Sequence, residues 1–138
     1  MNLREELERT KNLLVVKECL VDYVGPIFVF GNIESELEDY NPCVISATMD
    51  REEFAILNGR VPMWIDEITK KSSEVYNILI IKDMDKISLE KQEILLDILE
   101  NNQVSLEDLP ENLKIILTAT SKCDINSKIR DIVECYEI

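Results

Sequence analysis

The sequence predicts one α/β domain over residues 1–138, a three-layer sandwich around a mostly parallel five-stranded sheet. Two observations favour this fold: four short runs consist of consecutive apolar residues, and helical patterns alternate with those runs. Strands that are buried on both faces show such unbroken runs, and they are typical of parallel sheets covered by helices on each side. A chain of this length is expected to form a single domain with its own core.

The elements follow in order along the chain. The four apolar runs predict strands, and an alternating segment predicts a fifth: 27–30, 43–48, 76–81, 113–120 and 133–138. Residues with a period close to 3.6 predict the helices. These helices are expected at 3–22, 50–58, 62–72, 89–100 and 125–133.

Capping residues support several of these boundaries. Asp50 and Ser88 are favourable N-caps for the helices that follow them, and Pro62 suits a first helical turn. Asn101 and Asn102 end the clearest helix. In the first helix, one face carries a row of apolar side chains, namely Leu3, Leu7, Leu14 and Val21.

Composition narrows the functional classes. Apolar residues make up 46% and charged residues 31% of the chain, and no apolar stretch approaches the roughly 20 residues of a membrane helix. The charged start lacks the layout of a signal peptide, so a cytoplasmic location is expected. The net charge of −13 disfavours direct nucleic-acid binding. The scattered acidic residues are interpreted as a solvated surface or, alternatively, as a surface for a basic protein partner.

Cysteine and histidine usage excludes further chemistry. The cysteines at 19, 43, 123 and 135 have no CxxC spacing, and the chain has no histidine, so no zinc or other metal site is expected. Histidine-dependent nucleophilic catalysis is excluded for the same reason. All four cysteines adjoin apolar runs and are expected to be buried, reduced thiols. The single Trp64 is expected to belong to the core.

A more specific pattern begins at Tyr76. The segments "YNILIIKDMDKISLEKQEILLDILENN" and "LPENLKIILTATS" resemble the second half of an AAA+ ATPase core, as found in clamp-loader subunits and MoxR-type proteins. In that family, a strand ending in the Walker B acids is followed by a helix and a strand with the sensor 1 residue. A short helix leading to an arginine finger and a last strand complete the core. Residues 1–75 match only in the order of elements.

The Walker A position departs from the family. A GxxxxGK[ST] loop follows the first strand there, and its amides and lysine hold the phosphates. Counted from Gly31, the second glycine falls at Glu36 and the lysine at Leu37. The serine or threonine falls at Glu38, and the connection is too short for the loop plus a full helix. Like charges about 4 Å apart repel by about 4 kcal/mol near a surface, so this loop is expected to exclude nucleotide.

The Walker B position is also altered. In "ILIIKDMD", Lys82 occupies the place of the magnesium-side aspartate and Asp83 that of the catalytic glutamate. A lysine repels a cation instead of coordinating it. A register shifted by one makes Asp83 the first acid and Met84 the second, which also removes the water-activating carboxylate. An unrelated use of Asp83 and Asp85 as paired acid–base carboxylates remains an alternative.

The remaining AAA+ positions, sensor 1 and the arginine finger, match the family pattern less clearly. Thr118, Thr120 or Ser121 stands at the sensor 1 position. The clamp-loader arginine falls on Ile132, and the nearest arginine, Arg130, comes two residues early. The chain ends with the fifth strand, so the helical lid of the family is expected to be missing.

Three functions follow as hypotheses. The first is a non-catalytic, AAA+-like module without cofactor that acts through protein contacts: a degenerate ring subunit, an adaptor or an inhibitor. An active AAA+ protein or a replication factor is the expected kind of partner. The second is a divergent nucleotide-binding ATPase, and the third is an unrelated α/β enzyme that uses Asp83 and Asp85.

Overall fold

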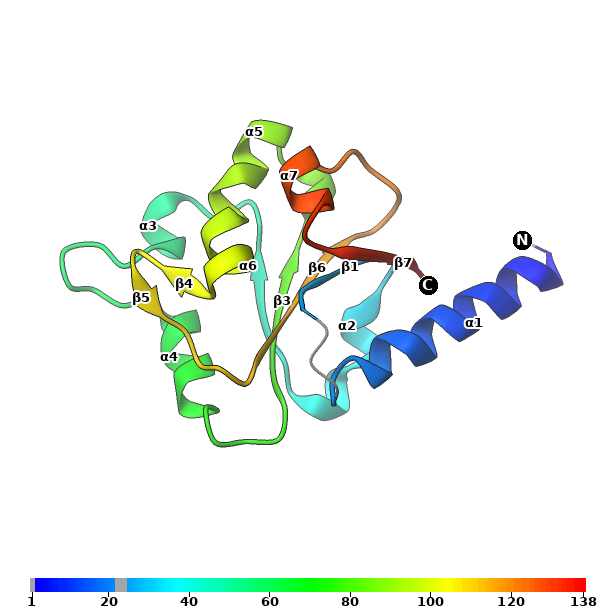
Figure 1. Ribbon diagram of the computed structural model, residues 1–138, viewed down its shortest axis with the longest axis horizontal. Helices are drawn as coiled ribbons and strands as arrows, with labels where there is room; N and C mark the ends of the chain where they lie inside the picture. The colour runs from blue at the N-terminus through cyan, green and yellow to red at the C-terminus, as the bar shows by residue number, and fades with distance from the viewer. Residues whose placement is uncertain (1, 22–24) are drawn as a thin grey trace.

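A computed structural model describes residues 2–21 and 25–138 of the chain. Its centre is a sheet of five parallel strands in the order β2-β3-β6-β1-β7, flanked by helices (Figure 1). This architecture confirms the predicted α/β class and the parallel sheet. The strands of this sheet are β1 (Ile27–Phe30), β2 (Cys43–Ser46), β3 (Asn77–Lys82), β6 (Leu113–Ala119) and β7 (Glu134–Glu137).

Most helices of the described residues are short. The α-helices are α1 (Leu3–Glu18), α2 (Ile33–Glu36), α3 (Arg51–Phe54), α4 (Met63–Lys70), α5 (Leu89–Gln92), α6 (Leu96–Asn101) and α7 (Ser127–Arg130). The 3-10 turns are η1 (Glu38–Tyr40), η2 (Met84–Lys86) and η3 (Glu93–Leu95). A small antiparallel hairpin, β4 (Gln103–Val104) with β5 (Glu107–Asp108), was not predicted from the sequence.

Two predicted helices differ in the structure. The helix expected at 50–58 is one turn long: Asp50 forms a capping box with Glu53, but the chain then extends and reverses at Asn58. A cap fixes only the first turn, and the extended backbone of Ala55 (φ −96°, ψ +161°) ends the helix after Phe54. The helix expected at 89–100 tightens into η3 directly after Gln92. Ser88 caps its start as expected.

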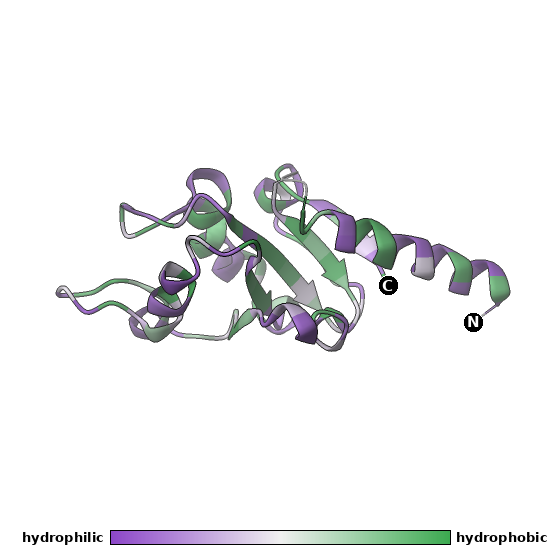
Figure 2. Cartoon of the chain, turned by 90° about the horizontal axis from the view of Figure 1, so that it is seen from below, coloured by the Kyte–Doolittle hydropathy of each residue, from purple (hydrophilic) through white to green (hydrophobic). Residues whose placement is uncertain are grey.

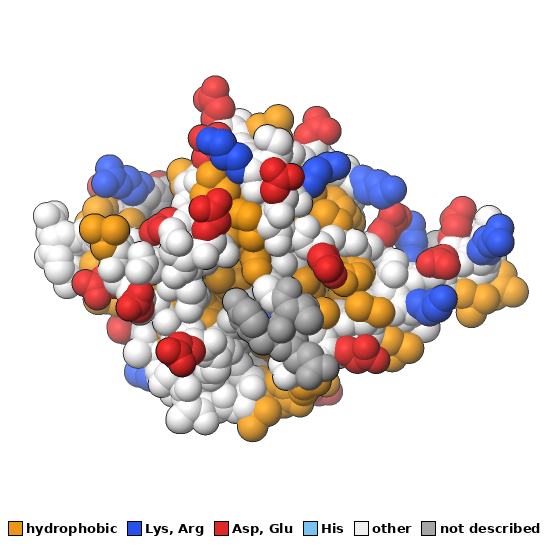
Figure 3. Space-filling model, in the orientation of Figure 1, with side chains coloured by type: hydrophobic (Ala, Val, Ile, Leu, Met, Phe, Trp, Pro, Cys, Tyr) orange, Lys and Arg blue, Asp and Glu red, His pale blue; other side chains and the backbone are white. Residues whose placement is uncertain are grey.

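The first helix also differs from its prediction. It ends at Glu18, and residues 22–24 lie outside the described part of the chain. Its N-terminal half extends beyond the sheet (Figures 1 and 2), so the predicted apolar face stays exposed to solvent. The exposed fractions of Leu3, Leu7 and Leu14 are 70%, 58% and 58%. Figure 3 shows hydrophobic side chains along one side of this helix.

The two faces of the sheet are covered unequally. One face packs against α4 to α7 and includes Phe28, Ile81 and Leu117 within a cluster of 22 buried residues of the described chain. On the opposite face, the cluster has nine buried residues, among them Val16 from α1 and Leu37. The strands are the most hydrophobic part of the chain (Figure 2), as their unbroken apolar runs predict.

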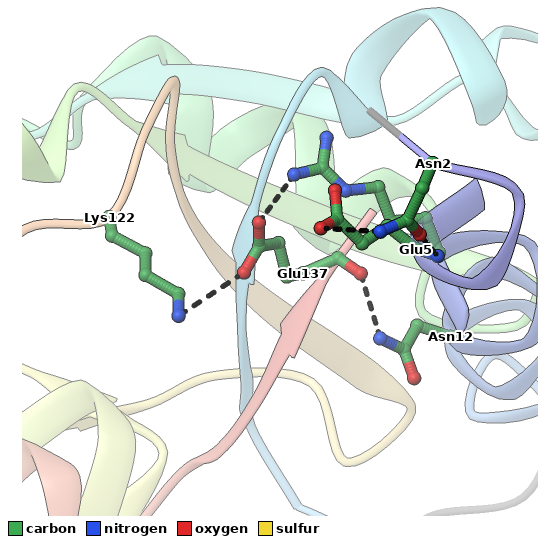
Figure 4. A network of polar contacts seen from close by, with 6 residues as sticks. Asn2, Glu5, Asn12, Lys122 and Glu137 are labelled. Atoms are coloured by element: carbon green, nitrogen blue, oxygen red, sulfur yellow. Dashed lines mark hydrogen bonds and ion pairs between the residues drawn. The ribbon is translucent and has the colours of Figure 1, made fainter. Parts of the chain in front are cut away.

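Helix α1 is tied to the edge strand β7 by polar contacts. Arg9 Nη2 lies 2.6 Å from Glu137 Oε1, and the Asn12 amide donates to the main-chain carbonyl of Glu137 at 2.8 Å (Figure 4). Lys122 approaches the same carboxylate at 3.4 Å. Within residues 2–21 and 25–138, none of the helices has the length and apolarity needed to cross a bilayer.

Cysteine burial is only partly as predicted. Cys19 and Cys43 are buried, whereas Cys123 is partly exposed and Cys135 is exposed, so the prediction is wrong for these two. Cys135 lies on β7, an edge strand with little covering it. Burial, followed by the contact with Glu67, raises the pKa of Cys43 to about 12, which keeps this thiol protonated. The core assignment of Trp64 is confirmed, because it is 5% exposed.

Candidate functional site

The candidate site lies where β1, β3 and β6 end. These strands are parallel, so their carboxyl ends meet at one edge of the sheet. The connections that leave β1 and β6, which are neighbours, run in opposite directions across the sheet. In doubly wound sheets, ligands bind outside the strand ends at such a switch point. The predicted positions at Gly31, Asp83 and Thr118 all come to this edge.

The end of β1 is closed by the chain itself. The Gly31 amide donates to the Ala119 carbonyl at 2.9 Å, and the Ile138 amide donates to the Phe30 carbonyl at 3.0 Å. Gly31 has φ +135°, and a Cβ added there would lie 2.7 Å from Ile138 Cγ1 and 2.9 Å from its carbonyl oxygen. A glycine is therefore required for close packing with Ile138, independently of any phosphate.

The connection after Gly31 contributes to the core. Helix α2 has four residues, capped by the Asn32 side chain, which accepts from the Ser35 amide at 3.4 Å. Leu37, which the sequence predicts to stand at the Walker A lysine position, is fully buried (0% exposed). Glu36 is exposed and lies 3.8 Å from Lys17, and Glu38 is exposed as well. Anion binding at a helix N-terminus needs free, aligned amides, and this one short turn presents an asparagine cap and acids instead.

The end of β3 is polar and hydrogen-bonded. Asp83 has a left-handed backbone (φ +66°) and accepts a hydrogen bond from Ser46 Oγ at 2.6 Å. Its other oxygen lies 3.2 Å from Lys86 Nζ. The Ser46 hydrogen bond, opposed by burial and assisted by the Lys86 and Lys82 charges, lowers the pKa of Asp83 below its ordinary value. Lys82 itself is half-buried at the end of the strand.

The sensor 1 candidates have different surroundings. Thr120 donates to Asp85 Oδ2 at 3.0 Å, and the second oxygen of this carboxylate is buried without a hydrogen-bond partner among the described residues. Thr118 is buried and donates to the Gly31 carbonyl at 3.1 Å, so it links the ends of β6 and β1. Ser121 is exposed. Thr120 is thus the candidate that the structure brings beside an acid of the β3 end.

The predicted arginine-finger position follows helix α7. Ile132 is half-buried against the larger core cluster, and Arg130 is exposed on α7. The start of α7 is held by Gln92, whose side chain accepts from the Asn126 amide at 2.7 Å and donates to the Asp124 carbonyl at 3.2 Å. These bonds fix the position of the short helix that carries Arg130.

Two contributors were missed at the sequence level. Ser46 and Thr48, 2.7 Å apart at the end of β2, form the polar neighbourhood of Asp83. The polar residues in "CVISAT" were a signal for them, because parallel neighbours end at the same edge. Nothing in the sequence around Ile138 predicted its contact with Gly31. Among the described residues, no group of three or more His, Cys, Asp or Glu side chains is arranged to hold a metal.

Comparison with known protein families found no match, and a search of characterised proteins also found none. The proposed function therefore rests on the fold and on the geometry of the strand ends. They define an α/β domain with a parallel sheet, an edge with two different strand ends, and no open glycine loop at β1.

Proposed function

We propose that the protein is a non-catalytic, AAA+-like module of the cytoplasm that acts through protein–protein contacts. In this role it is a degenerate ring subunit, an adaptor or an inhibitor of an ATPase or replication-type assembly. The observed order of strands, helices and polar strand ends agrees with the resemblance in residues 76–138. The proposal assigns no nucleotide, metal or other cofactor to the strand ends.

The packing at the end of β1 is the observation that supports this proposal best. A phosphate-binding loop needs backbone amides that face an open space and a lysine that reaches the phosphates. Here Ile138 packs on Gly31, and Leu37, at the lysine position, is fully buried in the core. Both residues serve the packing of the fold, and the exposed residues nearby, Glu36 and Glu38, are acidic.

The alternative of an acid–base enzyme has less support. Acid–base pairs work when their environments push the two pKa values apart, so that one carboxyl group holds a proton near neutral pH. The pKa of Asp83 is lowered, chiefly by Ser46, so this carboxyl is ionised at neutral pH and cannot donate a proton. Asp85 forms its hydrogen bond with Thr120 instead of Asp83.

Thermal unfolding with and without nucleotide tests the proposal. We expect the same melting temperature in buffer, in Mg-ATP and in Mg-ADP, because Ile138 packs on Gly31 and the exposed side chains after it are acidic, which disfavours a phosphate tail. A ligand present at 100 times its dissociation constant stabilises a protein by about 2.7 kcal/mol, which would raise the melting temperature by several degrees. Such a rise would contradict the proposal and favour the divergent ATPase.

A further inference from the structure

The outer edge of the sheet at β2 borders an open groove. Strand β2 is the terminal strand on this side, and all four of its residues line a groove of about 820 Å³. The walls come from α3 and α4, both at the left of Figure 1. A strand edge that faces a groove of this size can accept one more extended chain.

Backbone groups of β2 point into this groove. The Ala47 amide, just past the strand, donates to the Lys82 carbonyl of β3 at 2.8 Å. Because the direction of backbone groups alternates along a strand, the amides of Val44 and Ser46 point away from β3. The Val44 carbonyl points in the same outward direction. These groups are the ones that an added strand pairs with.

The floor of the groove is apolar. Val44 is 37% exposed and Met63 is 88% exposed, although both are large apolar side chains. Met49 and the buried Trp64 continue the floor beneath them. The indole of Trp64 stacks on Phe54 at a centroid distance of 5.3 Å, which gives the floor a rigid base. Flexible methionines beside a rigid aromatic group are typical of surfaces that bind apolar side chains of peptides.

The rim of the groove is acidic. Four exposed carboxylates line it, from Glu52 and Glu53 on α3 and from Asp66 and Glu67 on α4, against a single cation, Lys70. A second copy of this chain would place like charges opposite each other along the same edge, which is unfavourable. A segment that carries lysine or arginine places opposite charges there.

We infer that the β2 edge binds an extended, basic segment of a partner protein, which adds a strand to the sheet and inserts apolar side chains between Val44 and Met63. The partner segment alternates basic residues, which face the acidic rim, with apolar residues, which contact the floor. This inference rests on the proposed function only in that both assign the protein a binding role. Thermal unfolding with nucleotide does not test the groove. The proposed function and the binding at the β2 edge can therefore each fail independently.

A blocked synthetic peptide of seven alternating lysine and valine residues is a direct probe. Binding is followed by the fluorescence of Trp64, the single tryptophan of the chain, and by calorimetry. We expect saturable, 1:1 binding of this peptide, and no binding of its glutamate–valine counterpart. Two N-methylated peptides are compared, one with methyl groups on the odd-numbered and one on the even-numbered backbone nitrogens. Only one of the two should lose binding, because only one row of the peptide's amides faces β2. Absence of binding, or equal binding of the acidic peptide, would overturn the inference.

Two variants locate the site. Reversing two of the four rim charges with Glu52→Lys and Asp66→Lys should weaken binding at least about tenfold, because two favourable charge contacts are replaced by two repulsions. The matched control, Glu100→Lys with Glu111→Lys, reverses two exposed acids away from the groove and should leave the affinity within about twofold. Equal weakening by both pairs would show non-specific charge attraction and contradict the assigned site.

Val44→Pro tests the strand edge itself. Its amide points away from β3, so a proline there keeps the β2–β3 ladder and removes the outward donor. We expect a folded protein that binds the peptide at least about tenfold more weakly. If this variant does not fold, the N-methylated peptides give the same answer with the unchanged protein. A dimer of the unchanged protein that Val44→Pro converts to monomers would show that a second copy occupies the edge, and would overturn the inference.

Discussion

The ends of β1 and β3 are neighbouring strand ends at one edge of the sheet, but they are built in opposite ways. After β1, the residues contribute to core packing: Gly31 contacts Ile138, and Leu37 is fully buried. After β3, the chain is polar, and Asp83 is held by Ser46 and Lys86. Under the proposed function, both correspond to positions at which the AAA+ family handles ATP. The difference indicates that the β1 end is fixed by the stability of the fold, whereas the β3 end can change at lower cost.

The largest loss of stability is expected from placing a lysine, as in the Walker A motif, at position 37 after β1. Leu37→Lys buries an amine in the smaller core cluster, so we expect a loss of at least about 4 kcal/mol in the free energy of unfolding, without any gain of ATP binding. Urea denaturation measures the loss. Glu38→Thr, at the neighbouring exposed position, should change stability by less than about 0.5 kcal/mol. A stable Leu37→Lys protein that binds ATP would remove the contrast between the two strand ends.

An intermediate effect is expected at Gly31. In Gly31→Ala, the new methyl group meets Ile138 Cγ1 and its main-chain oxygen, so we expect a loss of about 2–3 kcal/mol in the free energy of unfolding. Gly59→Ala is the matched control: Gly59 also has a left-handed backbone (φ +75°), but nothing lies within 4 Å of its added Cβ. It should lose only about 1 kcal/mol from backbone strain. Equal losses would mean that Ile138 does not restrict the β1 end.

The smallest loss in the free energy of unfolding is expected for a substitution at the β3 end. Asp83→Asn keeps an acceptor for Ser46 and removes the charge that pairs with Lys86, so we expect a loss of about 1 kcal/mol at pH 7. The pKa of Asp83 is lower in the folded protein than its ordinary 3.8. Its contribution is therefore fully present above the ordinary pKa and is lost as the pH falls through the folded pKa.

The pH dependence of the stability of Asp83→Asn sharpens the comparison between the ends of β1 and β3. The difference between the unchanged protein and Asp83→Asn should shrink below about pH 4, when stability is measured by urea denaturation from pH 7 to pH 2. Asp85→Asn is a useful second variant at the same strand end, because Thr120 still has an acceptor there. A loss at Asp83 as large as that of Leu37→Lys would contradict the view that the β3 end is open to change.

The central strands β3 and β6 could be predicted from the sequence because their apolar runs are buried on both faces in the structure. The four residues of "NILII" that follow Asn77 have almost no exposure, and the β6 run is buried throughout. Helix lengths were harder to predict, since a capping box such as that of Asp50 determines where a helix starts but not how far it continues. The exposed face of α1 shows the same limit: its pattern predicts a helix, and only tertiary contacts decide what covers it.

The candidate site was predictable to the extent that strand ends share an edge. Asp83 and Thr120 came to the expected edge, and their hydrogen-bond partners, Ser46 and Asp85, lie on other segments. Contacts between residues far apart in the chain, such as Gly31 with Ile138, leave no trace in local spacing. For this reason the sequence identified the glycine but not its role.

The placement of Ile138 also affects the dynamics of the sheet. Strand β7 has four residues and lies at the edge of the sheet, so we expect its hydrogen bonds to open at a lower free energy than those of the central β3 and β6. Each fraying of β7 removes Ile138 from Gly31 and breaks its bond to the Phe30 carbonyl. Brief partial unfolding of this sheet edge therefore increases the solvent exposure of Gly31, which is half-buried in the folded state.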